Sequence, residues 1–250
     1  MAQESIPRRS FLKGAGAAGS AVAGAAIAGR LAEPAAAQSP GHEARPNQAA
    51  SNPAPADAAP ETWLTFTSAD AAFIVAAVDA LIPADELSPS GSECGVATYI
   101  DRQLASAWGG GAKMYRSGPF HKGKPEQGYQ QPLAPREYFL AGIAAANEWT
   151  RKTYGKDFDR LAPADRVAAL TAMEEGKAEF RNFSSRGFFA RLLTMTKEGF
   201  FADPVYGGNR NKVAWKMIGF PGLPATYARL IDEYRDKPYV ADPQSIADFS

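Results

Sequence analysis

The side chains that most often carry out chemistry in proteins are scarce in this sequence. Among its 250 residues there is one cysteine, Cys94, and there are two histidines, His42 and His121. These residues show no metal-ligand spacing, no Cys-x-x-Cys-His sequence for haem and no cysteine set for an iron–sulfur cluster. A Ser-His-acid triad would have to be built on His121, which lies in a Gly/Pro-rich stretch. We therefore expect no catalytic, cofactor-binding or metal-binding residue in this chain.

Two other features could suggest chemistry but favour a structural interpretation. Four carboxylates surround a turn rich in proline, serine and glycine, namely Asp79, Asp85, Glu86 and Glu93. We expect them to cap and solvate this turn and not to form an acid–base pair, since carboxylates commonly accept hydrogen bonds near helix ends. The triplet at residues 109–111 is all glycine, but no Lys-Ser pair follows it, so it predicts a helix end and not a phosphate-binding loop.

Cys94 cannot form an internal disulfide because it has no second cysteine to pair with. Free cysteine is often a buried small apolar residue. Three alternatives remain open from the sequence: a buried thiol, a free thiol, or an intersubunit bridge to another chain.

The N-terminal residues have the three-part layout of a bacterial export signal. Adjacent arginines, Arg8 and Arg9, are followed by Phe11, Leu12 and Lys13, and then by an Ala/Gly-rich run over 14–29. A small-residue site at Ala35 and Ala37 predicts cleavage before Gln38. The paired arginines indicate the twin-arginine (Tat) route, which carries folded proteins. We expect the Tat translocase to be a partner and the chain to reach the periplasm.

Composition limits the class of the remaining chain. Residues 1–37 hold four basic and two acidic side chains, so 23 basic and 25 acidic ones follow, a formal charge of −2. This balance argues against nucleic-acid binding, which rests on a basic face. No later run of 18 apolar residues occurs, so we expect membrane association only through a complex. We predict a signal over 1–37, a disordered Pro/Ala-rich linker over 38–61 and one domain over 62–250.

Helical periodicity dominates that domain, and no window shows sustained strand alternation. We predict an all-α, irregular domain of five to six helices with long Gly/Pro-rich connections. In the helix expected near 163–175, Val167, Leu170 and Met173 should face the core. The expected helices cover about 68–81, 95–108, 135–154, 163–175, 185–201 and 223–235.

A long loop is expected over 109–135 and contains interleaved aromatic residues. Loops of this length are usually functional or disordered. One alternative is therefore a free-standing periplasmic module that binds a small ligand such as a sugar, with Trp108, Tyr115, Phe120 and Tyr129 stacking on it. An independent enzyme is disfavoured by the missing catalytic groups.

Two stretches have sequences that are too specific for a generic helical bundle. One runs from Leu81-Ile82-Pro83-Ala84-Asp85 to Cys94-Gly95-Val96-Ala97-Thr98-Tyr99-Ile100-Asp101, and the other reads GFFADPVYGGNRNKVAWKMIGFPG over 199–222. With these motifs the chain resembles the gluconate 2-dehydrogenase subunit 3 family over roughly residues 64–235. The signal and the linker fit this family too.

The resemblance implies a complex at the outer face of the inner membrane. Its large subunit would be an FAD-dependent flavoprotein of the GMC type that oxidises a sugar, sugar acid or alcohol, and a multihaem cytochrome c subunit would take the electrons. The small subunit has no redox centre and bears the Tat signal, and the large subunit crosses as its passenger. The substrate, stoichiometry and signal cleavage stay open.

A docking hypothesis follows for the second stretch. Tyr206, Asn209, Arg210 and Trp215 would meet the flavoprotein, because Tyr, Trp and Arg are frequent at interface hot spots. Cys94 joins this set if it forms an intersubunit bridge. In the alternative, these residues are an internal scaffold whose turns hold the preceding helix onto the core.

Overall fold

The computed structural model describes residues 62–121, 123–124, 131–181, 184–224 and 226–249, all within one compact unit. The predicted export signal, its cleavage site and the linker lie outside these residues. The described part contains six α-helices and, apart from one isolated bridge between Gly222 and Gln244, no β pairing, which confirms the all-α class. The helices are α2 (Ser68–Leu81), α3 (Val96–Ala105), α4 (Pro135–Tyr154), α5 (Pro163–Glu174), α6 (Ser185–Phe201) and α7 (Val213–Ile218).

Local sequence signals explain where most of these helices begin and end. Thr67 and Asp70 form a reciprocal capping box at the start of α2, with the Asp70 N–H donating to Thr67 Oγ1 over 3.2 Å. Pro135 occupies the first turn of α4, and Gly155 ends it in the left-handed conformation. At the start of α6 the Ser184 hydroxyl accepts the Gly187 N–H. The bounds of α2, α4 and α6 match the predicted ones.

Four buried phenylalanines form the centre of the core. Phe73 of α2 packs against Phe158 with ring centroids 4.7 Å apart, and Phe139 of α4 meets Phe188 of α6 at 5.6 Å. The Phe188 ring fits because α4 has Gly142 opposite it; a Cβ there would lie 2.1 Å from a ring carbon. Aromatic burial of this kind supplies a large share of the hydrophobic stabilisation of a domain.

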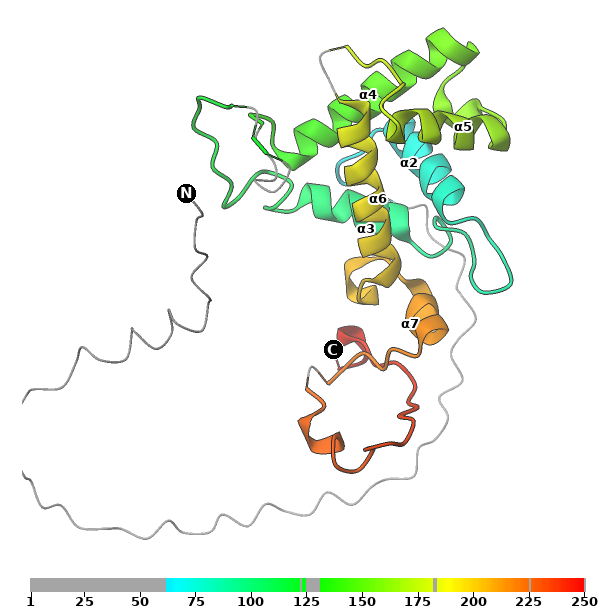
Figure 1. Ribbon diagram of the computed structural model, residues 1–250, viewed down its shortest axis with the longest axis vertical. Coiled ribbons are helices and arrows are strands. Elements are labelled where there is room, and N and C mark those ends of the chain that lie inside the picture. Colours follow the sequence, from blue (N-terminus) through cyan, green and yellow to red (C-terminus); the bar gives the residue numbers. More distant parts are fainter. Residues whose placement is uncertain (1–61, 122, 125–130, 182–183, 225, 250) are drawn as a thin grey trace, which may run out of the picture. The chain divides into compact units, whose positions relative to one another are not determined.

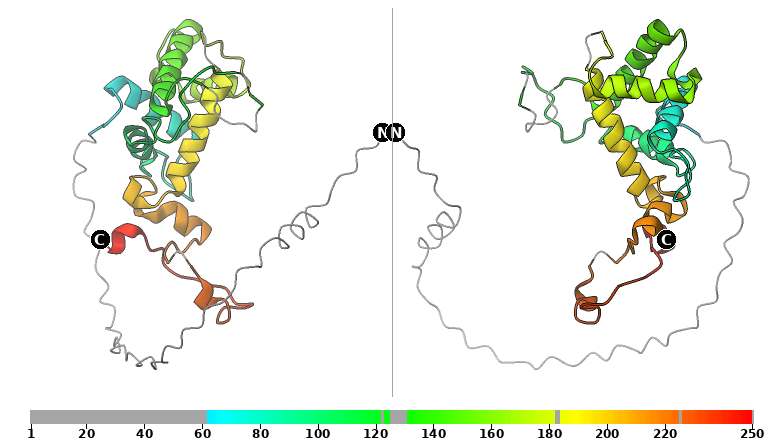
Figure 2. Two further views of the ribbon diagram at one scale, coloured as in Figure 1. Left: turned by 90° about the vertical axis from the view of Figure 1, so that its left-hand side faces the viewer. Right: turned by 45° about the vertical axis from the view of Figure 1, so that its right-hand side comes forward.

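Helix α2 contacts α3, α4, α5 and α6, and α3 packs along α6. Figure 1 shows α6 running past α3 and α7 following at its C-terminal end. The last residues return to the same region: the turn η6 (Ile246–Phe249) contacts the turn η3 (Pro204–Tyr206), and both views in Figure 2 show this return. The segment just after α6 is thus in contact with the C-terminal residues.

The buried carboxylate of Asp101 fastens the start of the described chain to α3. It accepts the backbone N–H groups of Leu64, Thr65 and Phe66 at 2.7, 2.9 and 3.0 Å. These three donors have no strand or helix to pair with, so the carboxylate takes the place of a backbone ladder. Residues 64–66, which follow the predicted linker, are therefore held on α3.

Two helix predictions are wrong, one at its ends and one throughout. The helix expected over 95–108 begins after Gly95 and stops at Ala105, because the Ser106 backbone is extended and its hydroxyl donates to the Gln103 carbonyl. The α-helix expected over 223–235 is replaced by turns around η5 (Ala228–Leu230). Ile231 there is exposed, so this segment lacks the packed face that stabilises a short helix.

Two further differences concern α5 and α7. Val167 was expected in the core but is exposed, whereas Leu170 and Met173 are buried as predicted. One helix, α7, was not predicted, because the turns on either side of it suggested a loop throughout. Its run of six residues without glycine or proline was the available signal.

We expect Asp101→Ala to destabilise the domain by about 2–4 kcal/mol, because it leaves three backbone donors without their acceptor. Urea unfolding would measure the loss, and hydrogen exchange at residues 64–66 would show where it arises. Asp232→Ala is the control, since that side chain is 92% exposed and should shift the midpoint little. A variant that keeps both the wild-type midpoint and slow exchange at 64–66 would contradict the anchoring role.

Candidate functional site

The candidate site is formed where residues 203–212, here the GGN segment, pack on the N-terminal end of α3. The Arg210 N–H donates to the Cys94 carbonyl over 3.0 Å. The Arg210 guanidinium reaches Thr98 Oγ1 over 3.3 Å, joining residues 112 positions apart in the chain. The two motifs that stand out in the sequence therefore lie side by side.

The contact between them requires glycine. Gly95 has a φ of +82°, and a Cβ at this position would lie 2.3 Å from the Gly207 carbonyl oxygen. Any side chain would push the GGN segment away from α3, and most would also be strained by the positive φ. Glycine therefore allows the two backbones to touch.

Asn209 holds the GGN segment from inside. It is fully buried, with its backbone in the left-handed region at φ 46° and ψ 44°. Its side-chain amide donates to the Ala202 carbonyl over 3.0 Å, and its side-chain oxygen accepts the Ala214 N–H at 2.9 Å. One side chain thus connects the end of α6 to the first turn of α7.

Trp215 is also buried and uses its polar group within the chain. Its ring is 6% exposed, its Nε1–H donates to the Phe201 carbonyl over 2.8 Å, and it stacks edge-on against Phe220 with centroids 5.2 Å apart. For Asn209 and Trp215 the geometry favours the internal-scaffold alternative, because both use their polar groups within the chain.

Cys94 is also buried, at 1% exposure, and its Sγ–H faces the Pro89 carbonyl at 3.5 Å. Burial raises the pKa of the thiol, and the nearby carboxylates of Glu93 and Asp79 raise it further. A thiol with a raised pKa is mostly protonated at neutral pH and reacts slowly. In this structure Cys94 is therefore a buried thiol, which is the first of the three alternatives. The intersubunit bridge stays a prediction.

Two of the predicted contact residues face outward. Tyr206 is 49% exposed at the end of η3, and Arg210 is exposed at the start of the turn η4 (Arg210–Lys212). Both protrude from a segment that is fixed beneath them by Asn209. A rigid platform that carries an exposed tyrosine and arginine is well suited to contact another protein.

Beside Tyr206 the surface is hollowed between α3 and α6. One hollow of about 490 Å³ and a neighbouring one of about 250 Å³ share the side chains of Tyr99, Gln103 and Glu198; together they are called the α3–α6 groove here. Its remaining lining residues are Trp108, Met195, Phe201, Ala202, Asp203 and Tyr206.

Gly199 determines the depth of this groove. A Cβ on Gly199 would lie 2.8 Å from a ring carbon of Tyr99, so the ring packs directly against the α6 backbone. Burial raises the pKa of the Tyr99 phenol, and the adjacent Glu198 carboxylate and Tyr206 raise it further. The phenol is therefore an uncharged hydrogen-bonding group in the groove.

The sequence reasoning missed most of the groove. Tyr99 and Gln103 are four residues apart and therefore lie on one face of α3. Gly199 inside α6 was a second signal, because a glycine within a helix often lets another segment approach the backbone closely. Neither sign indicates which helix lies opposite. Of the ligand-stacking aromatics proposed for the 109–135 loop, Trp108 lines the groove, Tyr115 is exposed, and Tyr129 lies outside the described residues.

The carboxylates of the first motif take the predicted structural roles: three accept hydrogen bonds in the turn and the fourth is solvent-exposed. Asp79 accepts the Ser92 N–H at 2.8 Å, Asp85 accepts that of Leu87 at 2.8 Å, and Glu93 accepts that of Ser90 at 2.9 Å. Glu86 is exposed. In the described residues no group of three or more His, Cys, Asp and Glu side chains is placed to hold a metal ion. No described helix is long and apolar enough to cross a membrane.

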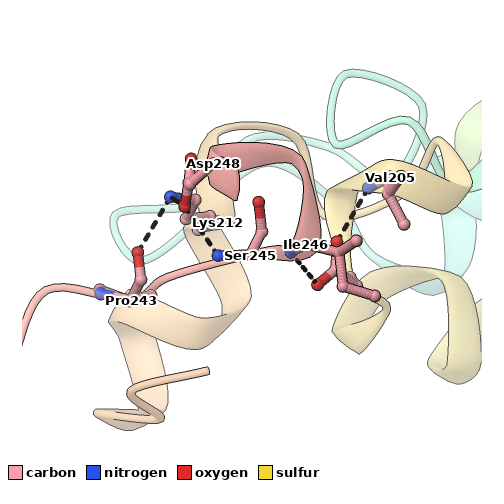
Figure 3. Close-up of polar contacts among 7 residues, drawn as sticks. Val205, Lys212, Pro243, Ser245, Ile246 and Asp248 are labelled. Carbon is pink, nitrogen blue, oxygen red and sulfur yellow. Dashed lines mark hydrogen bonds and ion pairs between the residues drawn. The ribbon is translucent and has the colours of Figure 1, made fainter. Parts of the chain in front are cut away.

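The C-terminal residues form a clasp over the GGN segment (Figure 3). Lys212 donates to the Pro243 carbonyl over 2.9 Å and pairs with Asp248, which also accepts the Ser245 N–H. Asp203 accepts the Val205 N–H with one oxygen and the Ile246 N–H with the other, at 3.0 and 2.9 Å. The clasp brings residues 243–248 onto the platform that carries Tyr206 and Arg210.

The comparison with known families settles the membership of the chain. The family model of gluconate 2-dehydrogenase subunit 3 matches residues 68–222. This chain belongs to that family. The match spans α2 to α7 and includes both motifs and the α3–α6 groove, whereas the C-terminal clasp residues 243–248 follow it. The chain matches no curated protein and no solved structure.

We expect Asn209→Gly to destabilise the domain by about 2–4 kcal/mol, because it deletes two buried hydrogen bonds while still allowing the left-handed backbone. Asn211→Gly is a matched control: Asn211 has a φ of 57° but is exposed, so its loss should change stability by less than about 1 kcal/mol. Chemical denaturation of both variants would measure the difference. Equal midpoints would show that the Asn209 side chain does not hold the segment.

The clasp should depend on pH through Asp248. Its pKa lies below the ordinary value of 3.8, chiefly because of the hydrogen bond from Lys212 and then the one from the Ser245 N–H. A lowered pKa in the folded state means that the contribution is fully present above pH 3.8 and is lost as the pH falls through the lowered value. We expect the Ser245 amide resonance to titrate below pH 3.8, as followed by NMR.

Two variants test this assignment. Asp248→Asn should abolish that titration, and Lys212→Met should move its midpoint up toward 3.8. Lys216→Met is the control, because Lys216 is exposed on α7 and is not part of the clasp. If the Lys212 variant titrates as the wild type does, the ion pair does not hold the clasp.

Proposed function

We propose that this chain is the non-catalytic small subunit of a membrane-associated, periplasm-facing, FAD-dependent dehydrogenase, and that it escorts the flavoprotein subunit through Tat export and then stabilises it. The observation that carries the proposal is the family match over residues 68–222, which makes the chain a subunit of a dehydrogenase complex. The dehydrogenase would resemble gluconate 2-dehydrogenase, with its substrate selected by the large subunit.

The proposed division of chemistry between subunits rests on the family resemblance and agrees with the side chains of this chain. With a single cysteine and two histidines, the sequence offers no ligand set for haem or an iron–sulfur cluster. By resemblance to the family, FAD would be held by the large subunit and haem c by a cytochrome subunit. The small subunit contributes protein surface.

That surface is proposed to be the platform formed by the GGN segment. Tyr206 and Arg210 are exposed on it, while Asn209 is buried beneath them and keeps the backbone in place. A preformed surface loses little conformational freedom on binding, which favours a stable complex. Cys94 would contribute to the partner interface only if its thiol became accessible.

The escort role rests on the paired arginines Arg8 and Arg9. Tat carries folded proteins, and a flavoprotein must fold to retain FAD. A small subunit that binds the folded large subunit in the cytoplasm directs both to the Tat translocase through its own signal. The complex then remains together at the periplasmic face of the inner membrane.

We expect the double variant Arg8→Lys, Arg9→Lys to strand the dehydrogenase activity in the cytoplasm when the chain is co-expressed with the large subunit. Cell fractionation followed by an activity assay with an artificial electron acceptor would measure this. Arg30→Lys is the matched control, since it makes the same exchange in the same signal but outside the arginine pair. Activity that still reaches the periplasm in the double variant would refute the escort role.

A further inference from the structure

The α3–α6 groove has a chemistry that none of the motifs suggested. It combines aromatic walls with negative charge. Tyr99 lies against the α6 backbone as its floor, and partly exposed rings of Trp108, Phe201 and Tyr206 line it. Aromatic faces attract cations through their quadrupole and also bury apolar stems.

The charges in the groove have a single sign. Its two ionisable acids are Glu198 and Asp203, and no lysine or arginine lines either hollow. Arg102 packs over Gly207 at the edge: a Cβ on that glycine would lie 2.9 Å from the guanidinium. The lining itself is therefore complementary to a cation.

Of these two carboxylates, Glu198 is the one available to a partner. Asp203 uses both oxygens on the Val205 and Ile246 N–H groups of its own chain. Glu198 is exposed on α6 and lines both hollows, and within the described residues it has no hydrogen bond or ion pair. Its carboxylate is therefore available in a groove that aromatic rings also line.

We infer that the α3–α6 groove receives an arginine side chain of the large dehydrogenase subunit, with Glu198 pairing to the guanidinium and the aromatic rings covering its faces. Arginine fits both the carboxylate and the aromatic lining. Its planar guanidinium donates two parallel hydrogen bonds to a carboxylate and stacks on aromatic rings. The inference rests on the proposed function and adds to it the chemistry of the contact.

The groove adjoins the proposed docking platform. Tyr206 belongs to both, and residues 199–208 pass from α6 into the GGN segment without a break. A partner seated on Tyr206 and Arg210 would therefore cover the open side of the groove. A desolvated carboxylate without a cation is costly, so the partner should supply one.

The test is the affinity of the purified chain for the purified large subunit, measured by biolayer interferometry. We expect Glu198→Gln to weaken binding about tenfold and Glu198→Lys to weaken it further, because the first removes the pair and the second repels the arginine. Glu174→Gln is the matched control: it removes the same charge from an exposed glutamate at the end of α5 and should leave the affinity unchanged.

The outcomes separate the two proposals. Absence of binding by the wild-type chain refutes the proposed function and this inference with it. Wild-type binding that Glu198→Gln leaves unchanged, or that both glutamine variants weaken equally, overturns the groove inference alone. Binding to a second copy of this chain that depends on Glu198, in place of the large subunit, also overturns it.

A second measurement identifies the occupant. Gln103 lines both hollows, so replacing it with the photoreactive p-benzoylphenylalanine places a cross-linker inside the groove. After irradiation of the complex, mass spectrometry should recover a large-subunit peptide that contains an arginine. A cross-linked peptide without arginine would contradict the inference, whatever the affinities.

Discussion

The contact of two backbones at Gly95 and Gly207 is the constraint on which the candidate site depends. It places the GGN segment directly on the start of α3, where a Cβ would collide with a carbonyl oxygen 2.3 Å away. The hydrogen bond from the Arg210 N–H to the Cys94 carbonyl and the side-chain contact to Thr98 follow from that approach. Without it, Tyr206 and Arg210 would not share a surface with the groove between α3 and α6.

The polar side chains near the site mostly stabilise backbone conformation. Asn209, Asp203, Asp101 and Asp79 each satisfy backbone N–H or carbonyl groups in loops or at helix ends. Buried or half-buried loops need such partners, because an unpaired backbone group away from water is costly. The irregular half of this domain is therefore as specifically held as its helices, and it can present a fixed surface to a partner.

The sequence allowed most of the fold to be predicted and less of the site. Helices α2, α4 and α6 have strong caps and long apolar stripes, so their bounds could be read directly from the residues. Failures came where burial, and not propensity, decides the conformation. Residues 226–235 include good helix formers such as Ala228, Leu230 and Glu233, but none of the ten is buried, whereas α7 forms because Trp215 and Ala214 are buried. In the site, Tyr206 and Trp215 are both aromatic and look alike in sequence, yet one is exposed and the other is internal.

By itself, the sequence determined the helical class, the scarcity of cofactor ligands and the two motifs that carry the family resemblance. These are properties of residue type and short-range spacing, which caps, periodicity and composition express locally. Only the tertiary structure decided that Asn209, Trp215 and Cys94 lie inside, that an exposed Glu198 lines a groove with aromatic residues, and that residues 243–248 clasp the GGN segment. Those facts depend on contacts between residues far apart in the chain, such as Thr98 and Arg210, and local spacing does not encode which distant segments meet.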